Sequence, residues 1–115
     1  MTDIDPALLA EYREALQDVY DQLDRAHPLA ATLEAKDTLR ELAEAVFDSL
    51  TALNQADIAS NRAQYAAVRA DIGDVNRKLQ TVQSRIDGWI HVVSVSVQTT
   101  NAIGKAIDLG SKVFV

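Results

Sequence analysis

The stretch VRADIGDVNRKLQTVQSRIDGWIHVVSVSV, residues 68–97, has the most regular spacing of apolar side chains in the chain. Steps of three and four residues separate its apolar positions, which are Val68, Ile72, Val75, Leu79, Val82, Ile86, Trp89 or Ile90, Val93, Val97 and then Thr100. Such a 3–4 alternation places one apolar stripe along a helix that packs in coiled-coil fashion. The stretch therefore predicts an all-α protein built as an elongated antiparallel helical bundle or coiled-coil hairpin.

Two glycines, Gly73 and Gly88, interrupt this pattern without changing its phase. A glycine inside a helix costs about 1 kcal/mol relative to alanine, which weakens the helix but does not have to end it. We therefore predict one continuous helix over residues 60–112. The alternative is a turn at Gly88, which would produce a compact four-helix bundle from residues 5–26, 29–57, 60–87 and 89–110.

The first part of the chain predicts two further helices. Asp5 is a good N-cap and Pro6 suits the first helical position, so a helix should begin there. Pro28 should end or kink this helix. Its apolar face consists of Leu9, Tyr12, Leu16, Val19, Leu23 and Ala26. The second helix should cover about residues 29–57, and a cluster of capping residues predicts a turn near residues 57–61. Its apolar face consists of Ala35, Leu39, Leu42, Val46, Leu50 and Leu53, widened by Phe47.

The composition is that of one globular domain, residues 1–115, with 48% apolar and 24% charged side chains. The chain contains no cysteine, which excludes disulfides, zinc fingers and thiol nucleophiles. The N-terminal residues lack the basic start and apolar segment of a secretory signal, so a cytoplasmic location is expected. A protein exported without a leader would have the same features.

The formal net charge of −6 is divided unevenly along the chain. Residues 1–50 carry twelve Asp and Glu against four Lys and Arg, whereas residues 51–115 carry five against seven. Phosphate backbones repel an acidic protein, so nucleic acid is not an expected partner. The opposite signs of the two parts suggest that acidic helices pair with mildly basic ones inside the molecule.

The segment between Asp87 and Lys105 has no acidic or permanently basic side chain. As a helix it has two apolar seams: Ile90, Val93, Val97, Thr100 and Ile107 on one, and Val92, Val95, Thr99, Ala102, Ala106, Leu109 and Val113 on the other. A helix that is apolar on two sides needs to be surrounded by its own domain, by a second copy or by lipid. The run is too polar to span a membrane as a lone helix. Alternation over residues 93–97 would suit a short strand, but the helical phase on both sides favours a helix.

No sequence motif with a known chemistry is present. The chain lacks a Gly-x-Ser-x-Gly elbow, a phosphate-binding glycine loop, a His-Glu-x-x-His zinc helix and a dinucleotide fingerprint. His27 follows Asp24 and His91 follows Asp87 at helical spacing, but a di-metal bundle would need two Glu-x-x-His motifs and two more glutamates. We therefore predict no catalytic residue, no metal site, no cofactor and no enzymatic activity.

These features predict a non-enzymatic helical protein–protein interaction module that associates, with itself or with another helical protein, through its uncharged C-terminal helix. Trp89, the single tryptophan, would either anchor the interface or pack in the core. The residues expected at the interface are Trp89, Ile90, Val92, Val93, Val95, Val97, Ile103, Ile107, Leu109 and Phe114. One alternative is a membrane-active α-helical protein, either a pore former or a peripheral membrane component. A second is an acidic inhibitor or immunity-type protein that docks on a basic partner.

Overall fold

A computed structural model describes residues 6–55 and 62–113. Over these residues the chain forms four long helices: α1 (Pro6–Ala26), α2 (Leu33–Gln55), α3 (Arg62–Gln83) and α5 (Val93–Val113). Two short elements lie between them, the 3₁₀ turn η1 (His27–Leu29) and the helical turn α4 (Ile86–Trp89). The prediction of an all-α fold is confirmed, and residues 93–97 are helical rather than extended.

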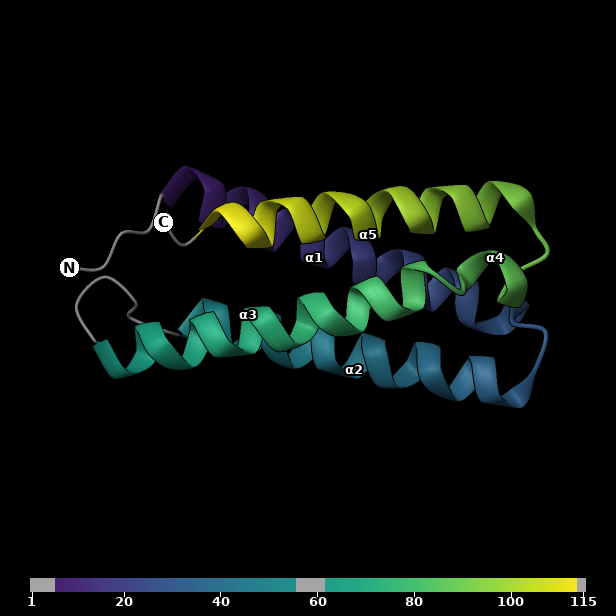
Figure 1. Cartoon of the computed structure of the whole chain (residues 1–115), viewed down its shortest axis with the longest axis horizontal. Helices are drawn as coiled ribbons and strands as arrows, with labels where there is room; N and C mark the ends of the chain where they lie inside the picture. Colours follow the sequence, from purple (N-terminus) through teal and green to yellow (C-terminus); the bar gives the residue numbers. More distant parts are fainter. Residues whose placement is uncertain (1–5, 56–61, 114–115) are drawn as a thin grey trace.

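Each long helix runs antiparallel to the long helix before it, and together they enclose one core (Figure 1). The order around this core is α1, α2, α3 and α5, because α1 and α3 each pack on both α2 and α5. The bundle measures 46 Å along its axis and 20 by 18 Å across. One end, here called the loop end, is formed by residues 27–32 and 84–92, which include η1 and α4 (Figure 1).

The expectation of one helix over residues 60–112 is wrong, because α3 ends at Gln83 and α5 begins only at Val93. No glycine in the described chain has a positive φ, and Gly88 itself lies within α4. The reversal is made instead by extended backbone at Ile90, with φ −119° and ψ 114°. This turn brings α5 back against α1 and α3, which buries apolar surface that a straight helix would leave in water. The bundle with a break near Gly88, our alternative prediction, is the observed arrangement.

The boundary between the first two helices follows from Pro28 and Thr32. Because Pro28 lies in η1, α1 ends just before it as predicted, but α2 begins later than predicted. Thr32 sets that start, since its Oγ1 accepts a hydrogen bond from the Ala35 amide at 3.1 Å. The predicted Asp5 cap and the predicted turn at residues 57–61 lie outside the described residues.

The apolar seams predicted for the first three long helices form the core, as the buried side chains show. These side chains are Tyr12, Leu16, Val19, Leu23 and Ala26 of α1, Ala35, Leu39, Leu42, Val46, Leu50 and Leu53 of α2, and Val68, Ile72, Val75, Leu79 and Val82 of α3. Leu9 is only partly buried but packs against the same core. Local spacing therefore predicted correctly which face of each of these helices is turned inward.

The rest of the chain covers most of one predicted seam, although Val92 of that seam is 42% exposed, and part of the other, where Ile90 is 2% exposed. The buried residues of the first of these seams are Val95, Thr99, Ala102, Ala106, Leu109 and Val113. On the other seam Val93 is 74% exposed and Val97 is 50% exposed, whereas Ile107 packs partly buried against the core. The chain's own bundle thus supplies most of the surroundings that this helix needs, and its exposed valines lie near its N-terminal end.

A small polar cluster lies inside the bundle, where residues from all four long helices approach one another. Ser49 of α2 donates a hydrogen bond from Oγ to Asp71 Oδ2 of α3 at 2.5 Å. The hydroxyl of Tyr12 in α1 is buried and has no hydrogen-bond partner among the described residues. Burial, together with the nearby charge of Asp71, raises the pKa of Tyr12 well above its ordinary value. Gly110 of α5 packs against Tyr12 and against Asn76 of α3. Such a cluster favours one register of the four helices over others.

Candidate interaction surfaces

The ten residues expected at an interface fall into separate groups in the structure. Four of them belong to the core and contact the chain's own helices: Ile90, Val95, Ile103 and Leu109. Trp89 and Ile107 are half-buried and pack against that core. Three are exposed, at 42%, 74% and 50%: Val92, Val93 and Val97. Phe114 lies outside the described residues. Of the residues placed, the three valines are therefore the ones most open to a partner without rearrangement of the bundle.

Large apolar side chains are exposed mainly at the loop end of the bundle. The described chain has six such residues, and five of them lie at this end: Leu29, Leu33, Val92, Val93 and Val97, here called the end patch. Backbone contacts join the two loops that carry the patch. The Ala31 amide donates to the Trp89 carbonyl at 2.9 Å, and Ala30 pairs with Ile90 in an antiparallel bridge. Leu33 of α2 and the valines of α5 lie on helices at diagonal positions of the bundle, so the end patch is a set of residues at one end rather than one continuous surface. Exposed apolar side chains concentrated at one end of a fold can mark contact sites for other proteins or for membranes.

Side-chain contacts also hold the beginning of α5 in place. Ser96 donates from Oγ to Asp87 Oδ1 at 2.6 Å, which ties α5 to α4. Arg25 of α1 donates from Nη1 to Gln98 Oε1 at 3.2 Å. The exposed valines of α5 are therefore carried on a helix that is anchored to two neighbours, which gives a partner a preformed surface.

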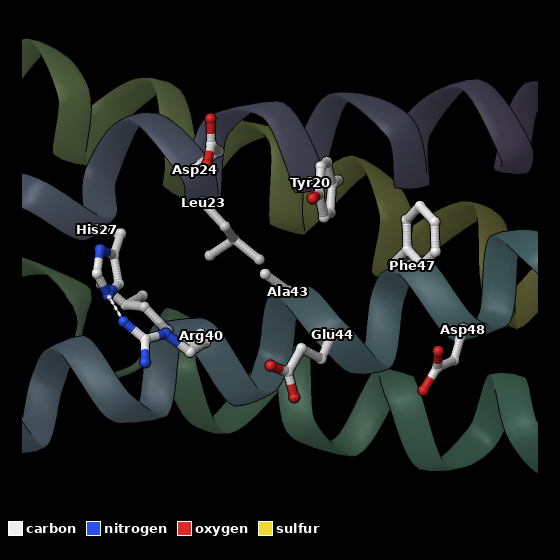
Figure 2. Close-up of a pocket in the computed structure, with 10 residues that line it drawn as sticks. Tyr20, Leu23, Asp24, His27, Arg40, Ala43, Glu44, Phe47 and Asp48 are labelled. Atoms are coloured by element: carbon white, nitrogen blue, oxygen red, sulfur yellow. Dashed lines mark hydrogen bonds between the residues drawn. The ribbon is translucent and has the colours of Figure 1, made fainter.

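A groove of about 450 Å³ lies between α1 and α2 along the side of the bundle (Figure 2). Its centre is apolar, because Tyr20 of α1 and Phe47 of α2 face each other with ring centroids 5.8 Å apart and ring planes 45° apart. Leu23 and Ala43 continue this apolar centre (Figure 2). Phe47 is 55% exposed, although it was predicted to widen the buried face of its helix. This aromatic ring therefore lies largely open to solvent in the groove.

Charged side chains border the apolar centre of the groove. Figure 2 shows Asp24 of α1 on one side of the apolar residues and Glu44 and Asp48 of α2 on the other. All three carboxylates are exposed. Toward one end of the groove, Arg40 donates to Nε2 of His27 at 3.4 Å. The groove is thus apolar along its middle, with three carboxylates on its borders against one cation, Arg40, toward one end.

The carboxylates of α1 and α2 outnumber the cations near them. These two helices carry ten exposed carboxylates and four Lys or Arg side chains. The arginines among the four donate hydrogen bonds to side chains other than carboxylates: Arg13 to Asn54, Arg25 to Gln98 and Arg40 to His27. Both ion pairs found in the described chain lie within one helix: Asp74 with Arg77 in α3 and Asp108 with Lys112 in α5. The acidic helices do lie against the others as predicted, α1 on α5 and α2 on α3, but over residues 6–55 and 62–113 no ion pair joins them.

The histidines and carboxylates do not gather into a metal-binding group in the described part of the chain. Asp24 and His27, which the sequence placed at helical spacing, both line the groove, where His27 contacts Arg40. None of the helices over the described residues is long and apolar enough to cross a membrane. The described residues present two distinct surfaces, the apolar end patch and a groove with apolar and acidic side chains.

No family model, curated protein or solved structure matches this chain. Sequence reasoning named the valines of the end patch, because two seams on one helix cannot both face a single core. It missed Leu29, Leu33 and Phe47, which it placed in a continuous helix or on a buried face. The periodicity contains no signal for these three, since their exposure depends on where α2 begins and on how α2 faces α1.

Proposed function

We propose that this protein is a non-enzymatic helical interaction module that self-associates through the end patch. The observation that carries the proposal is that five of the six large apolar side chains exposed in the described chain lie at one end of the bundle. Leu33 and Val93 are each 74% exposed, and covering apolar surface stabilises a contact by about 25 cal/mol per Å². A second copy presents the same leucines and valines, so a two-fold contact matches apolar surface with apolar surface.

The width of the bundle limits how strong this contact can be. The bundle is 20 by 18 Å across, so its end is smaller than the roughly 800 Å² that each partner buries in a standard stable interface. We therefore expect association that is weak and that increases with protein concentration. A measurement at a single low concentration would miss it.

Sedimentation equilibrium over a wide range of protein concentrations tests the proposal. Leu33→Asp and Val93→Asp each place a charge in the end patch at a side chain outside the core, so each variant should sediment as a monomer at concentrations where the wild type associates. Phe47→Ala is the matched control, because it removes an exposed apolar side chain outside the patch and should associate like the wild type. A wild-type chain that stays monomeric throughout, or equal association of Val93→Asp, refutes the proposal.

Lipid vesicles separate self-association from membrane activity, the alternative that the sequence suggested. Flotation with neutral and anionic vesicles, together with dye release, should show neither binding nor leakage if the end patch contacts a second copy. Vesicle binding that Val93→Asp abolishes would assign the end patch to lipid and overturn the proposal. Thermal melts of both charge variants should match the wild type, because neither side chain belongs to the core.

A further inference from the structure

The groove between α1 and α2 has two features that the packing of the core does not require, an exposed aromatic ring and unneutralised carboxylates. Phe47 is the one large apolar residue exposed outside the end patch in the described chain. Together with Tyr20 it borders a hollow of about 450 Å³, a volume within the usual range of ligand-binding sites. We propose that this groove binds a basic amphipathic helix of a partner protein.

The charge around the groove determines the charge of the partner. Asp24, Glu44 and Asp48 border the groove, and no cation of the described chain forms an ion pair with any of them. Because α1 and α2 together carry ten exposed carboxylates and four Lys or Arg side chains, the potential around these two helices is negative. This potential attracts a segment rich in Lys or Arg and repels nucleic acid and anionic lipid.

The shape of the groove fits a helix. The seam between two antiparallel helices is a place where the side-chain ridges of a third helix can pack. The lining residues of α2 run from Leu39 to Asp48, which corresponds to about 14 Å or between two and three helical turns. Apolar side chains at helical spacing would contact Tyr20 and Phe47, while basic side chains beside them would reach the carboxylates on both borders (Figure 2).

A second copy of this chain does not provide such a helix from its described residues. Among the described helices, α3 has the largest excess of basic over acidic residues. Its apolar face is buried in its own bundle through Val68, Ile72, Val75, Leu79 and Val82. Docking α3 into another molecule's groove would require that bundle to open. The occupant is therefore a different protein, and this proposal stands on a surface separate from the end patch.

The probe for this site is a fluorescent peptide of about eighteen residues, with leucine at helical spacing on one face and lysine on the other. Fluorescence anisotropy measures binding, and circular dichroism measures the helix that the peptide gains when bound. One control peptide has the same residues in shuffled order, and another has glutamate in place of lysine. Of the three peptides, only the basic amphipathic one should bind. Its affinity should fall as the salt concentration rises from about 0.05 to about 0.5 M.

Variants of the protein then locate the bound peptide. Phe47→Ala removes the exposed ring and Glu44→Lys reverses a charge at the border, and each should weaken binding at least about fivefold. Glu11→Lys is the matched control, because it makes the same charge change on α1. Glu11 lies nine residues before Tyr20, which is about 13 Å along the helix and beyond the screening length at physiological salt. Binding by Glu11→Lys should stay within about twofold of the wild type.

Several outcomes would overturn the proposal. Equal weakening by Glu44→Lys and Glu11→Lys would show general attraction between a basic peptide and an acidic protein. Failure of the basic peptide to bind would refute the proposed site. Equal binding of the shuffled peptide would show that the groove does not recognise an amphipathic helix. Val93→Asp should bind the peptide like the wild type, and loss of binding there would place the peptide on the end patch instead. Because Val93→Asp affects only self-association and Phe47→Ala only peptide binding, either proposal can fail without the other.

Discussion

Replacing Gly110 by alanine should lower the free energy of unfolding by about 1–2 kcal/mol, because α5 packs closely against its neighbours at this residue. A Cβ atom there would lie 2.9 Å from Asn76 Nδ2 and 3.0 Å from Tyr12 Cε1. Both distances are roughly half an ångström shorter than favourable van der Waals separations. The Asn76 amide ends a flexible side chain and can move aside. The Tyr12 ring is 0% exposed, so it can move only if the core around it also moves.

Two opposing effects determine the size of this change. Overpacking a core costs about 1–3 kcal/mol, and the enclosed Tyr12 ring places this substitution in the upper part of that range. Alanine is also the better helix former, by about 1 kcal/mol over glycine. Gly73→Ala measures the second effect by itself, because a Cβ there would lie 3.9 Å from its nearest neighbour, Arg77 Nη1, within α3. Gly110→Ala should therefore be about 2–3 kcal/mol less stable than Gly73→Ala.

Urea unfolding followed by circular dichroism measures these differences, provided that the variants have equal m-values. Thermal melting should give the same order, with a shift of about 4 °C for each kcal/mol in a domain of this size. Equal stability of Gly110→Ala and Gly73→Ala would show that α5 has room for a methyl group at this point. That result would refute the close packing of α5 on Tyr12 and Asn76.

Two further substitutions test the burial of Tyr12 and the start of α2. Tyr12→Phe removes a buried hydroxyl that has no partner among the described residues, so at neutral pH it should raise the free energy of unfolding by about 1 kcal/mol. Burial and the charge of Asp71 raise the pKa of Tyr12 in the folded state, so the wild type should lose stability relative to Tyr12→Phe as the pH rises above the ordinary value of 10.0. The expected slope is about 1.4 kcal/mol per pH unit, and parallel pH profiles of the two proteins would contradict it. Thr32→Ala removes the hydroxyl that caps α2 and should cost about 1 kcal/mol in urea unfolding. Thr51→Ala is its control, because the Thr51 hydroxyl only bonds back to the Phe47 carbonyl within α2, and an equal loss in both variants would argue against the cap.

The candidate surfaces could be predicted from the sequence only in part. Val93 and Val97 were predictable, because a helix with two apolar seams exposes one of them when it packs against a single core. Leu33 was not, since its exposure depends on the late start of α2 after the cap at Thr32. Phe47 was not either, because the angle at which α2 faces α1 decides whether a residue beside the seam is covered. The acidic excess was plain from composition, but the absence of ion pairs between the described helices was not.

The spacing of apolar residues was sufficient to assign the helices and the buried faces of α1, α2 and α3, because helical periodicity is a property of neighbours within a few turns. The same spacing continues through residues 84–92 without a change of phase, so it does not predict that the chain reverses direction there. Packing between distant segments ends the helix at this point. With the turn, α5 buries Ala102, Ile103 and Ala106 against α1 and α3, and this burial outweighs the hydrogen bonds of a continuous helix. That long-range packing also leaves the end patch and the acidic groove at the surface, where a partner can reach them.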